Sequence, residues 1–147
     1  MGYITNDDIK TRLGTTTYLQ LTDDDGNGSA AAGVVDEARL GAEGELDSYM
    51  ATRYTVPLDL SGEPALAAVI KSFALDLAVY RLHSRRTPIP SDISKRRDEA
   101  TTWLNRVALG YVQLPASVAL RENPAVVASP RTNIEPRAMT RAQLENL

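Results

Sequence analysis

The sequence predicts an all-α protein: a compact helical bundle of three longer helices plus short N-terminal helices, with an extended C-terminal arm. Three long stretches place apolar residues three and four positions apart, which is the spacing of one helix face. Prolines and glycines separate these stretches, and no run alternates apolar and polar side chains as a strand would. We therefore expect one helical domain at residues 1–114 and an arm at residues 115–147.

Two short helices are expected at the N-terminus. Thr5, with Asp8 three residues later, has the pattern of a capping box and begins a helix that runs through Arg12. Gly14 stops this helix, and a second helical segment is expected at residues 16–21. An acidic loop follows it.

Three longer helices then follow in order. The first should span about residues 30–54, and the second about residues 64–86, with a proline in its first turn. Ser91 is the expected N-cap of the third, which runs through Leu109 to a glycine cap at Gly110. The residues predicted to face inward are Val35, Ala38, Ala42, Leu46, Tyr49 and Arg53 on the first, Leu66, Val69, Ile70, Phe73, Leu77 and Tyr80 on the second, and Ile93, Ala100, Leu104, Val107 and Ala108 on the third.

The arm differs from the body in composition. It contains four of the eight prolines and no aromatic residue, so it can form neither a long helix nor a core of its own, apart from a final helical turn at residues 140–147. Such a segment is either an unstructured terminus or one that orders on a partner. Four of its arginines are candidate partner contacts: Arg121, Arg131, Arg137 and Arg141.

Composition and charge exclude several classes of protein. A chain of 147 residues has the length of one domain and can bury a core without covalent cross-links. It has no cysteine, which excludes disulfide bonds, thiol nucleophiles and thiolate metal ligands, and which is typical of a reducing compartment. The net charge of −3 gives no overall nucleic-acid signature. Since no apolar stretch approaches the roughly 18 residues of a membrane span, we expect no membrane partner.

The stretch DDDGNGS, which begins at Asp23, matches half of a calcium loop. Asp23, Asp25 and Asn27 occupy the first, third and fifth ligand positions of such a loop. The twelfth position should hold a bidentate glutamate, but it is Val34. We therefore expect no metal and interpret the stretch as a connector in which Ser29 or a nearby aspartate caps the next helix.

No catalytic or cofactor-binding constellation is recognisable in the sequence. His83 is the only side chain whose ordinary pKa lies near neutral pH, and it stands among cations at a predicted helix end. Ser-x-x-Lys and Gly-x-Ser-x-Gly signatures are missing. We expect neither an enzyme nor a cofactor.

A basic cluster is the first candidate binding surface. Its cations end one predicted helix and open the next, on either side of a short proline-containing turn. The cluster is either an electrostatic surface for DNA or an acidic partner, or a set of ordinary salt bridges, for example with Asp92, Asp98 and Glu99. Its members are Arg81, Arg85, Arg86, Lys95, Arg96 and Arg97.

A second candidate surface is the end of the first long helix. Tyr49, Arg53 and Tyr54 share one face there, and a planar guanidinium can stack on tyrosine while it pairs with a carboxylate. The group is either a helix end docked on the following loop or a contact with another subunit.

Five segments taken together resemble the Mu-like phage and prophage family of small head–tail joining proteins, which are neck adaptors similar to head-completion proteins. The resemblance covers roughly residues 2–114, and the arm at residues 115–147 lies outside it. Most specific are Tyr49, Arg53, Tyr54 and Pro57, followed by Trp103 and Leu104. The segments read YITNDDIKTRLG, LQLTDDDGNG, ELDSYMATRYTVPL, ALDLAVYRLHSRR and ATTWLNRVALGYVQL.

This resemblance implies a helical adaptor in the neck of a virion or phage-like particle, assembled in the bacterial cytoplasm. Its expected partners are further copies of itself in a ring, expected to be a dodecamer, the portal protein above the ring, and a stopper or tail-completion protein below. Genomic DNA would pass through the channel without sequence-specific binding. The alternative expectation is a helical nucleic-acid-binding regulator that uses the basic cluster at residues 81–97.

Overall fold

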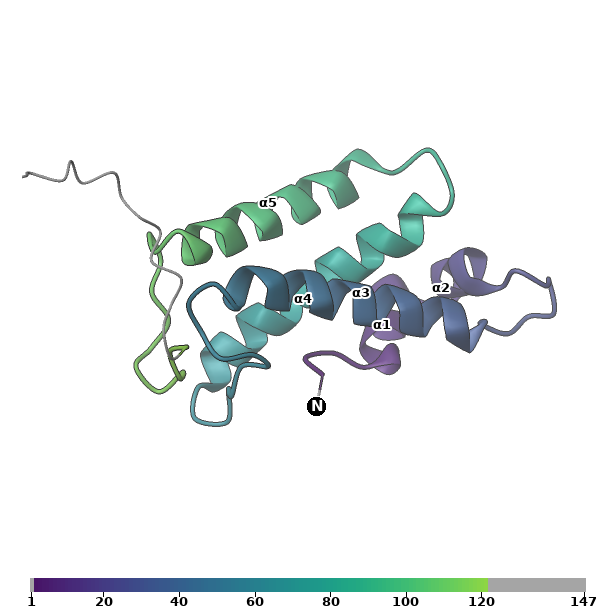
Figure 1. Cartoon of the computed structure of the whole chain (residues 1–147). Coiled ribbons are helices and arrows are strands. Elements are labelled where there is room, and N and C mark those ends of the chain that lie inside the picture. Colours follow the sequence, from purple (N-terminus) through teal and green to yellow (C-terminus); the bar gives the residue numbers. More distant parts are fainter. Residues whose placement is uncertain (1, 122–147) are drawn as a thin grey trace, which may run out of the picture.

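The computed structural model describes residues 2–121, which form five helices and no strand (Figure 1). The all-α prediction is therefore confirmed, with two short helices and three longer ones. The predicted helical turn at residues 140–147 lies outside the described residues, as does most of the arm. The helices are α1 (Asn6–Leu13), α2 (Thr15–Thr22), α3 (Ala32–Met50), α4 (Pro64–Ser84) and α5 (Ser91–Ala108).

Helix α4 is the centre of the bundle and contacts each of the other four helices. Helix α5 runs back antiparallel to α4, and α3 crosses α4 and also contacts α5 (Figure 1). Ala74 and Ala78 of α4 are fully buried, as is Ala42 of α3, and such small side chains allow close packing of helices. The predicted apolar face of α4 is wrong at Val69, which is 40% exposed.

Local capping explains most of the helix ends. The capping box at Thr5 is present: the Asp8 amide donates to Thr5 Oγ1 (3.2 Å), and the Thr5 amide donates to the Asp8 carboxylate (2.9 Å). Gly14 and Gly110 have φ angles of +77° and +82°, as expected for glycines that end helices. Ser91 is the first residue of α5 and not its N-cap, because Pro90 occupies that position.

Helix α3 is shorter than predicted at both ends. Its N-cap is Ala31, which has no side chain that can cap, so the predicted cap by Ser29 or an aspartate is wrong. The helix ends at Met50, and the chain turns there so that Tyr54 forms an antiparallel bridge with Leu120. A contact with a segment more than 60 residues away thus overrides the helical pattern.

The N-terminal segment is held against α3 by side-chain hydrogen bonds. The Ile4 amide donates to Glu43 Oε1 at 3.0 Å, and Glu43 is itself buried. The Tyr3 hydroxyl donates to Asp47 Oδ1 (2.5 Å) and accepts from the Leu58 amide (2.8 Å). Burial, followed by the hydrogen bond to Asp47, raises the pKa of the Tyr3 phenol well above its usual range.

Packing onto the body continues past the expected boundary at residue 114. Val118 is only 2% exposed and belongs to the main core. The Thr55 amide donates to the Ala119 carbonyl (3.0 Å), and the Arg121 amide donates to the Arg53 carbonyl (2.9 Å). Residues 115–121 therefore complete the fold of the helical body.

Replacing Val118 should test this packing. Val118→Ala removes two buried carbons, each worth about 0.8 kcal/mol, and leaves a small cavity, so we expect the free energy of unfolding to fall by about 2 kcal/mol. Leu120→Ala is the matched control, because Leu120 is 63% exposed and its loss should change stability by less than about 0.5 kcal/mol. Urea unfolding followed by circular dichroism measures both. Equal, small effects would mean that the segment does not pack on the helices.

Candidate functional site

The acidic loop between α2 and α3 makes internal hydrogen bonds. Both carboxylate oxygens of Asp23 accept backbone amides, from Asn27 (3.2 Å) and Gly28 (2.8 Å). These bonds, that from Gly28 first, lower the pKa of Asp23. Among residues 2–121 no group of three or more His, Asp or Glu side chains is placed to hold a metal ion. The loop is thus built as a turn, with its first aspartate already engaged.

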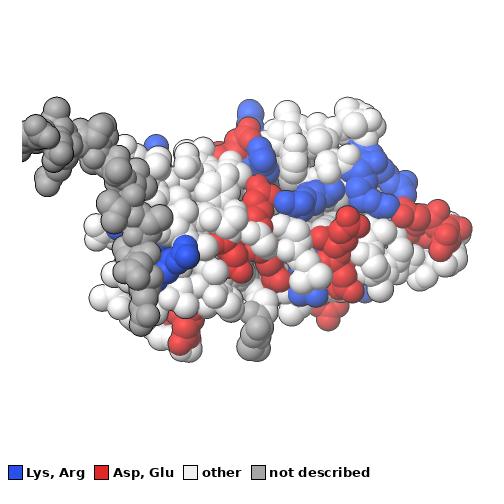
Figure 2. Space-filling model, viewed as in Figure 1, with Lys and Arg blue, Asp and Glu red and all other residues white. Residues whose placement is uncertain are grey.

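Two cations of the basic cluster are paired with the same acidic loop. Arg85 binds Asp24 at 2.5 Å and donates to the Leu21 carbonyl at 2.9 Å, and Arg86 reaches Asp24 at 3.3 Å. Hydrogen bonding to Arg85 is the main reason that the pKa of Asp24 is lowered. Figure 2 shows the blue cations and red acids adjoining at this end of the molecule.

Two more members of the cluster meet on one carboxylate of α3. Glu45 accepts from Arg81 at 2.8 Å and lies 3.7 Å from Arg97, which also stands over the Tyr80 ring at 5.2 Å from its centroid. Gly41 leaves room for the Arg81 side chain in this arrangement. A Cβ at position 41 would lie 2.9 Å from an Arg81 guanidinium nitrogen, so the guanidinium would have to shift.

The structure therefore divides the predicted cluster and does not present it as one surface. Lys95 and Arg96 lie on the exposed side of α5, and no ion pair within the described part of the chain involves them. The other four cations form ion pairs with three carboxylates, those of Asp24, Glu45 and Asp98. Of the three suggested from sequence, only Asp98 is one of these partners, at 3.4 Å from Arg97.

The residues at the end of α3 have different roles. Tyr54 is buried, and its hydroxyl accepts the Leu114 amide at 2.9 Å, so it fixes the segment that follows α5. Arg53 packs against Gly110, whose place no residue with a Cβ could take without displacing the guanidinium. Tyr49 is partly buried. Of the three residues predicted to form a contact surface at this helix end, only Tyr49 and Arg53 are partly exposed, because Tyr54 is buried.

Of the four arm arginines, only Arg121 lies within the described residues. Its guanidinium donates to the Ala51 carbonyl at 3.0 Å, where α3 ends and its dipole favours a cation. Arg131, Arg137 and Arg141 lie outside the described residues.

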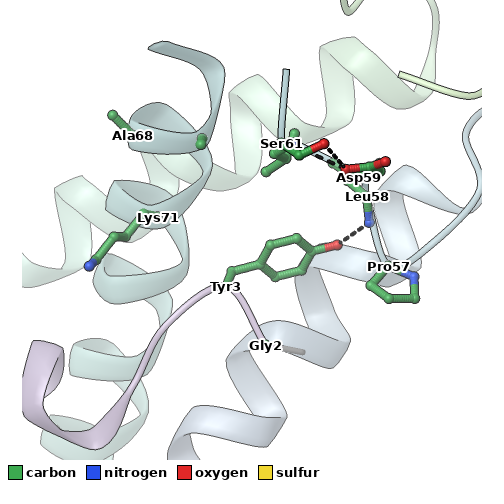
Figure 3. Close-up of a pocket in the computed structure, with 10 residues that line it drawn as sticks. Gly2, Tyr3, Pro57, Leu58, Asp59, Ser61, Ala68 and Lys71 are labelled. Carbon is green, nitrogen blue, oxygen red and sulfur yellow. Dashed lines mark hydrogen bonds between the residues drawn. The ribbon is translucent and has the colours of Figure 1, made fainter. Parts of the chain in front are cut away.

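Two surface pockets were not anticipated from the sequence. One, of about 610 Å³, lies between the N-terminal segment, the loop after Pro57 and the start of α4. Figure 3 shows the Tyr3 ring crossing it with its hydroxyl pointing at the Leu58 amide. Lys71, at its side, is paired with Asp8 at 2.7 Å. The Tyr3 hydroxyl and the Lys71 ammonium of this pocket are therefore already engaged within the chain.

The second pocket, of about 580 Å³, is a groove between α4 and α5. Its floor is an aromatic pair, Phe73 and Trp103, with ring centroids 5.0 Å apart and planes tilted by 41°. Lys95 and Arg106 lie on its rim beside the acids Asp98 and Glu99. Sequence analysis placed Phe73 in the core. Only the register of the two helices shows that its ring lines a surface.

Within residues 2–121 no helix is long and apolar enough to cross a membrane. The family model described as Bacteriophage Mu, Gp36 matches residues 3–129. The match extends past residue 114, where the resemblance was expected to end, and includes the packed segment at 115–121. No curated protein matches the chain.

Replacing Asp24 tests the pairing with Arg85 and Arg86. A carboxyl whose pKa is lowered by folding stabilises the protein above its unfolded pKa, and this contribution disappears as the pH falls through the folded value. Asp24→Asn should therefore lower the melting temperature at pH 7, and the difference from the unmodified chain should shrink in acid, as the pH falls below the ordinary aspartate pKa of about 3.9.

Melting curves followed by circular dichroism at pH 7 and in acid measure this effect. Asp25→Asn is the matched control: it removes the same charge from the same loop, and Asp25 forms no ion pair with any described residue. If the two variants melt alike at pH 7, the ion pairs with Asp24 contribute nothing to stability.

Proposed function

The chain belongs to the Bacteriophage Mu, Gp36 family, and on that premise we propose that it is a head–tail connector of a tailed phage or phage-like particle. In this role copies of the chain form a ring, proposed to be a dodecamer, below the portal. The ring joins the portal to a stopper or tail-completion protein, and the genome passes through it. The observation that carries the proposal is that residues 3–129 of this chain match the model of a phage protein family.

The charge distribution supports a channel component that does not hold DNA. Protein–DNA affinity depends on unpaired cations that neutralise phosphates. Here Arg85 and Arg86 share the single carboxylate of Asp24, and Arg81 and Arg97 pair with Glu45. Lys95 and Arg96 form no ion pair within residues 2–121, so part of the cluster remains available to phosphate. Partial pairing of this kind is compatible with DNA that passes without tight binding, and it weakens the alternative of a nucleic-acid-binding regulator that uses the cluster at 81–97.

The proposed role is structural and non-catalytic, and it places the protein in the neck of the virion after assembly in the host cytoplasm. The body supplies a helical unit whose N-terminal segment is bonded to α3 and whose last packed segment is bonded to residues 53–55, just after α3. We propose that the chain beyond this segment contacts the portal or a neighbouring subunit, with Arg131, Arg137 and Arg141 as contact residues. Arginines suit this task because a planar guanidinium binds carboxylates in a bidentate manner.

Truncation after Arg121 should separate folding from assembly. The truncated chain keeps Val118 and both hydrogen bonds to residues 53–55, so its melting temperature should stay close to that of the full chain. Its binding to the portal protein of the same phage should weaken by about tenfold or more, because contacts worth 1.4 kcal/mol change an affinity by that factor. Biolayer interferometry measures the binding, and electron microscopy of particles shows whether the neck is complete.

A triple variant, Arg131→Ala, Arg137→Ala and Arg141→Ala, provides a second measurement in a chain of full length. It should weaken portal binding in the same direction. Unchanged binding and complete necks with the truncated chain would refute the proposed role of this segment.

A further inference from the structure

Exposed apolar residues lie beyond one end of the groove between α4 and α5. Val69 lies one turn before Phe73 on α4, and Leu109 is the C-cap residue just after α5. Because the two helices are antiparallel (Figure 1), the start of α4 and the end of α5 lie toward the same end of the groove. Val69 is 40% and Leu109 is 53% exposed. An apolar floor with a charged rim and exposed apolar residues nearby is typical of a protein-binding site.

Helix α3 presents a different exposed surface. Leu40, 58% exposed, stands on its outer face one turn from the exposed Glu37. Gly33 and Gly44 lie on this same face, and a Cβ at either position would meet nothing within 4 Å. Each glycine destabilises the helix by about 1 kcal/mol relative to alanine, and packing within the chain does not require it. The result is a flat helix face with one protruding leucine.

The two surfaces lie on opposite sides of the bundle. Helices α3, α4 and α5 contact one another pairwise, so they form a triangle in cross-section. The outer groove of the α4–α5 edge is then on the side away from α3, whereas Leu40 points outward from the α3 corner. Different surfaces on opposite sides of one subunit produce head-to-tail association, and such association closes into rings when the rotation between copies allows it.

Charge complementarity relates the two surfaces. Glu37 beside Leu40 forms no ion pair with any residue in the range 2–121. Lys95 and Arg106 on the rim of the groove likewise have no acidic partner in the part of the chain that is described. The rim also carries two acids, Asp98, which pairs with Arg97, and the unpaired Glu99, so its two unpaired cations outnumber its unpaired acid. The groove thus combines an apolar floor with a small excess of positive charge, to which an acid such as Glu37 is complementary.

We propose that the α4–α5 groove of one copy receives the outer face of α3 from the next copy. Leu40 packs on the Phe73–Trp103 pair, and Glu37 pairs with Lys95 or Arg106. This identifies the self-association surface of the ring and so rests on the proposed function. The interface is apolar at its centre and charged at its rim, as in stable protein–protein contacts.

Cysteine cross-linking tests the surface even when association is weak. The chain has no cysteine, so Gly44→Cys and Thr102→Cys introduce single thiols, both at exposed positions, into separate full-length chains in which Leu40 stays in place. A Cβ at position 44 meets nothing within 4 Å. On oxidation the mixture should form the 44–102 heterodimer at least about tenfold faster than a mixture of Gly44→Cys with Thr16→Cys, an exposed control on α2, because docking raises the effective concentration of the thiols.

Fluorescence gives an independent measurement, because Trp103 is the only tryptophan and lies in the groove. Its emission should shift to the blue as the concentration of the unmodified chain rises. Leu40→Glu should abolish the shift, whereas Ser61→Glu, a control at an exposed position in the loop before α4, should retain it.

The outcomes separate this inference from the proposed function. If the 44–102 pair cross-links no faster than the control, the surface is wrong, and the connector role stands provided that the protein still completes necks. If the pair cross-links as expected but the protein neither binds the portal nor enters particles, the surface stands and the connector role is wrong. An emission shift that survives Leu40→Glu would also overturn the assignment.

Discussion

Burial of α4 on several sides is the constraint on which the rest of the structure depends. A helix that contacts all four others must be apolar around much of its circumference, and α4 is buried at seven positions. Its few charged side chains form three ion pairs with two neighbouring helices and so help to fix the register of the bundle, although exposed pairs add little stability. These pairs are Lys71–Asp8 and Arg12–Asp76 with α1 and Arg81–Glu45 with α3.

The sequence predicts those parts of the fold that depend on neighbouring residues. The capping box at Thr5, the glycine cap at Gly110 and all five helices follow from spacing and local chemistry. The predicted C-terminal end of α3, at residue 54, is wrong because Tyr54 forms a backbone bridge with Leu120 and does not continue the helix. The role of Glu43, which holds the Ile4 amide across 39 positions, leaves no local signal at all.

The candidate surfaces were harder to predict for the same reason. The basic cluster is visible in the sequence, but Asp24 and Glu45, which pair with four of its cations, lie 61 residues before Arg85 and 36 before Arg81. The groove at Trp103 depends on how α4 and α5 align. The residues around Glu37 in the sequence resemble those around any exposed acid, so the sequence does not predict that Glu37 lacks an ion-pair partner among residues 2–121. Intramolecular pairing of so many charges leaves apolar surface as the main means by which copies could associate, and such contacts persist at high salt.

The bridge between Tyr54 and Leu120 has a mechanical consequence. Two backbone hydrogen bonds and the buried Val118 side chain anchor the chain at its last described residues. A tensile load applied beyond Arg121 reaches the end of α3 through these contacts before it reaches α5. A force on the arm would therefore break the hydrogen bonds at residues 53–55 before it could separate α5 from the bundle.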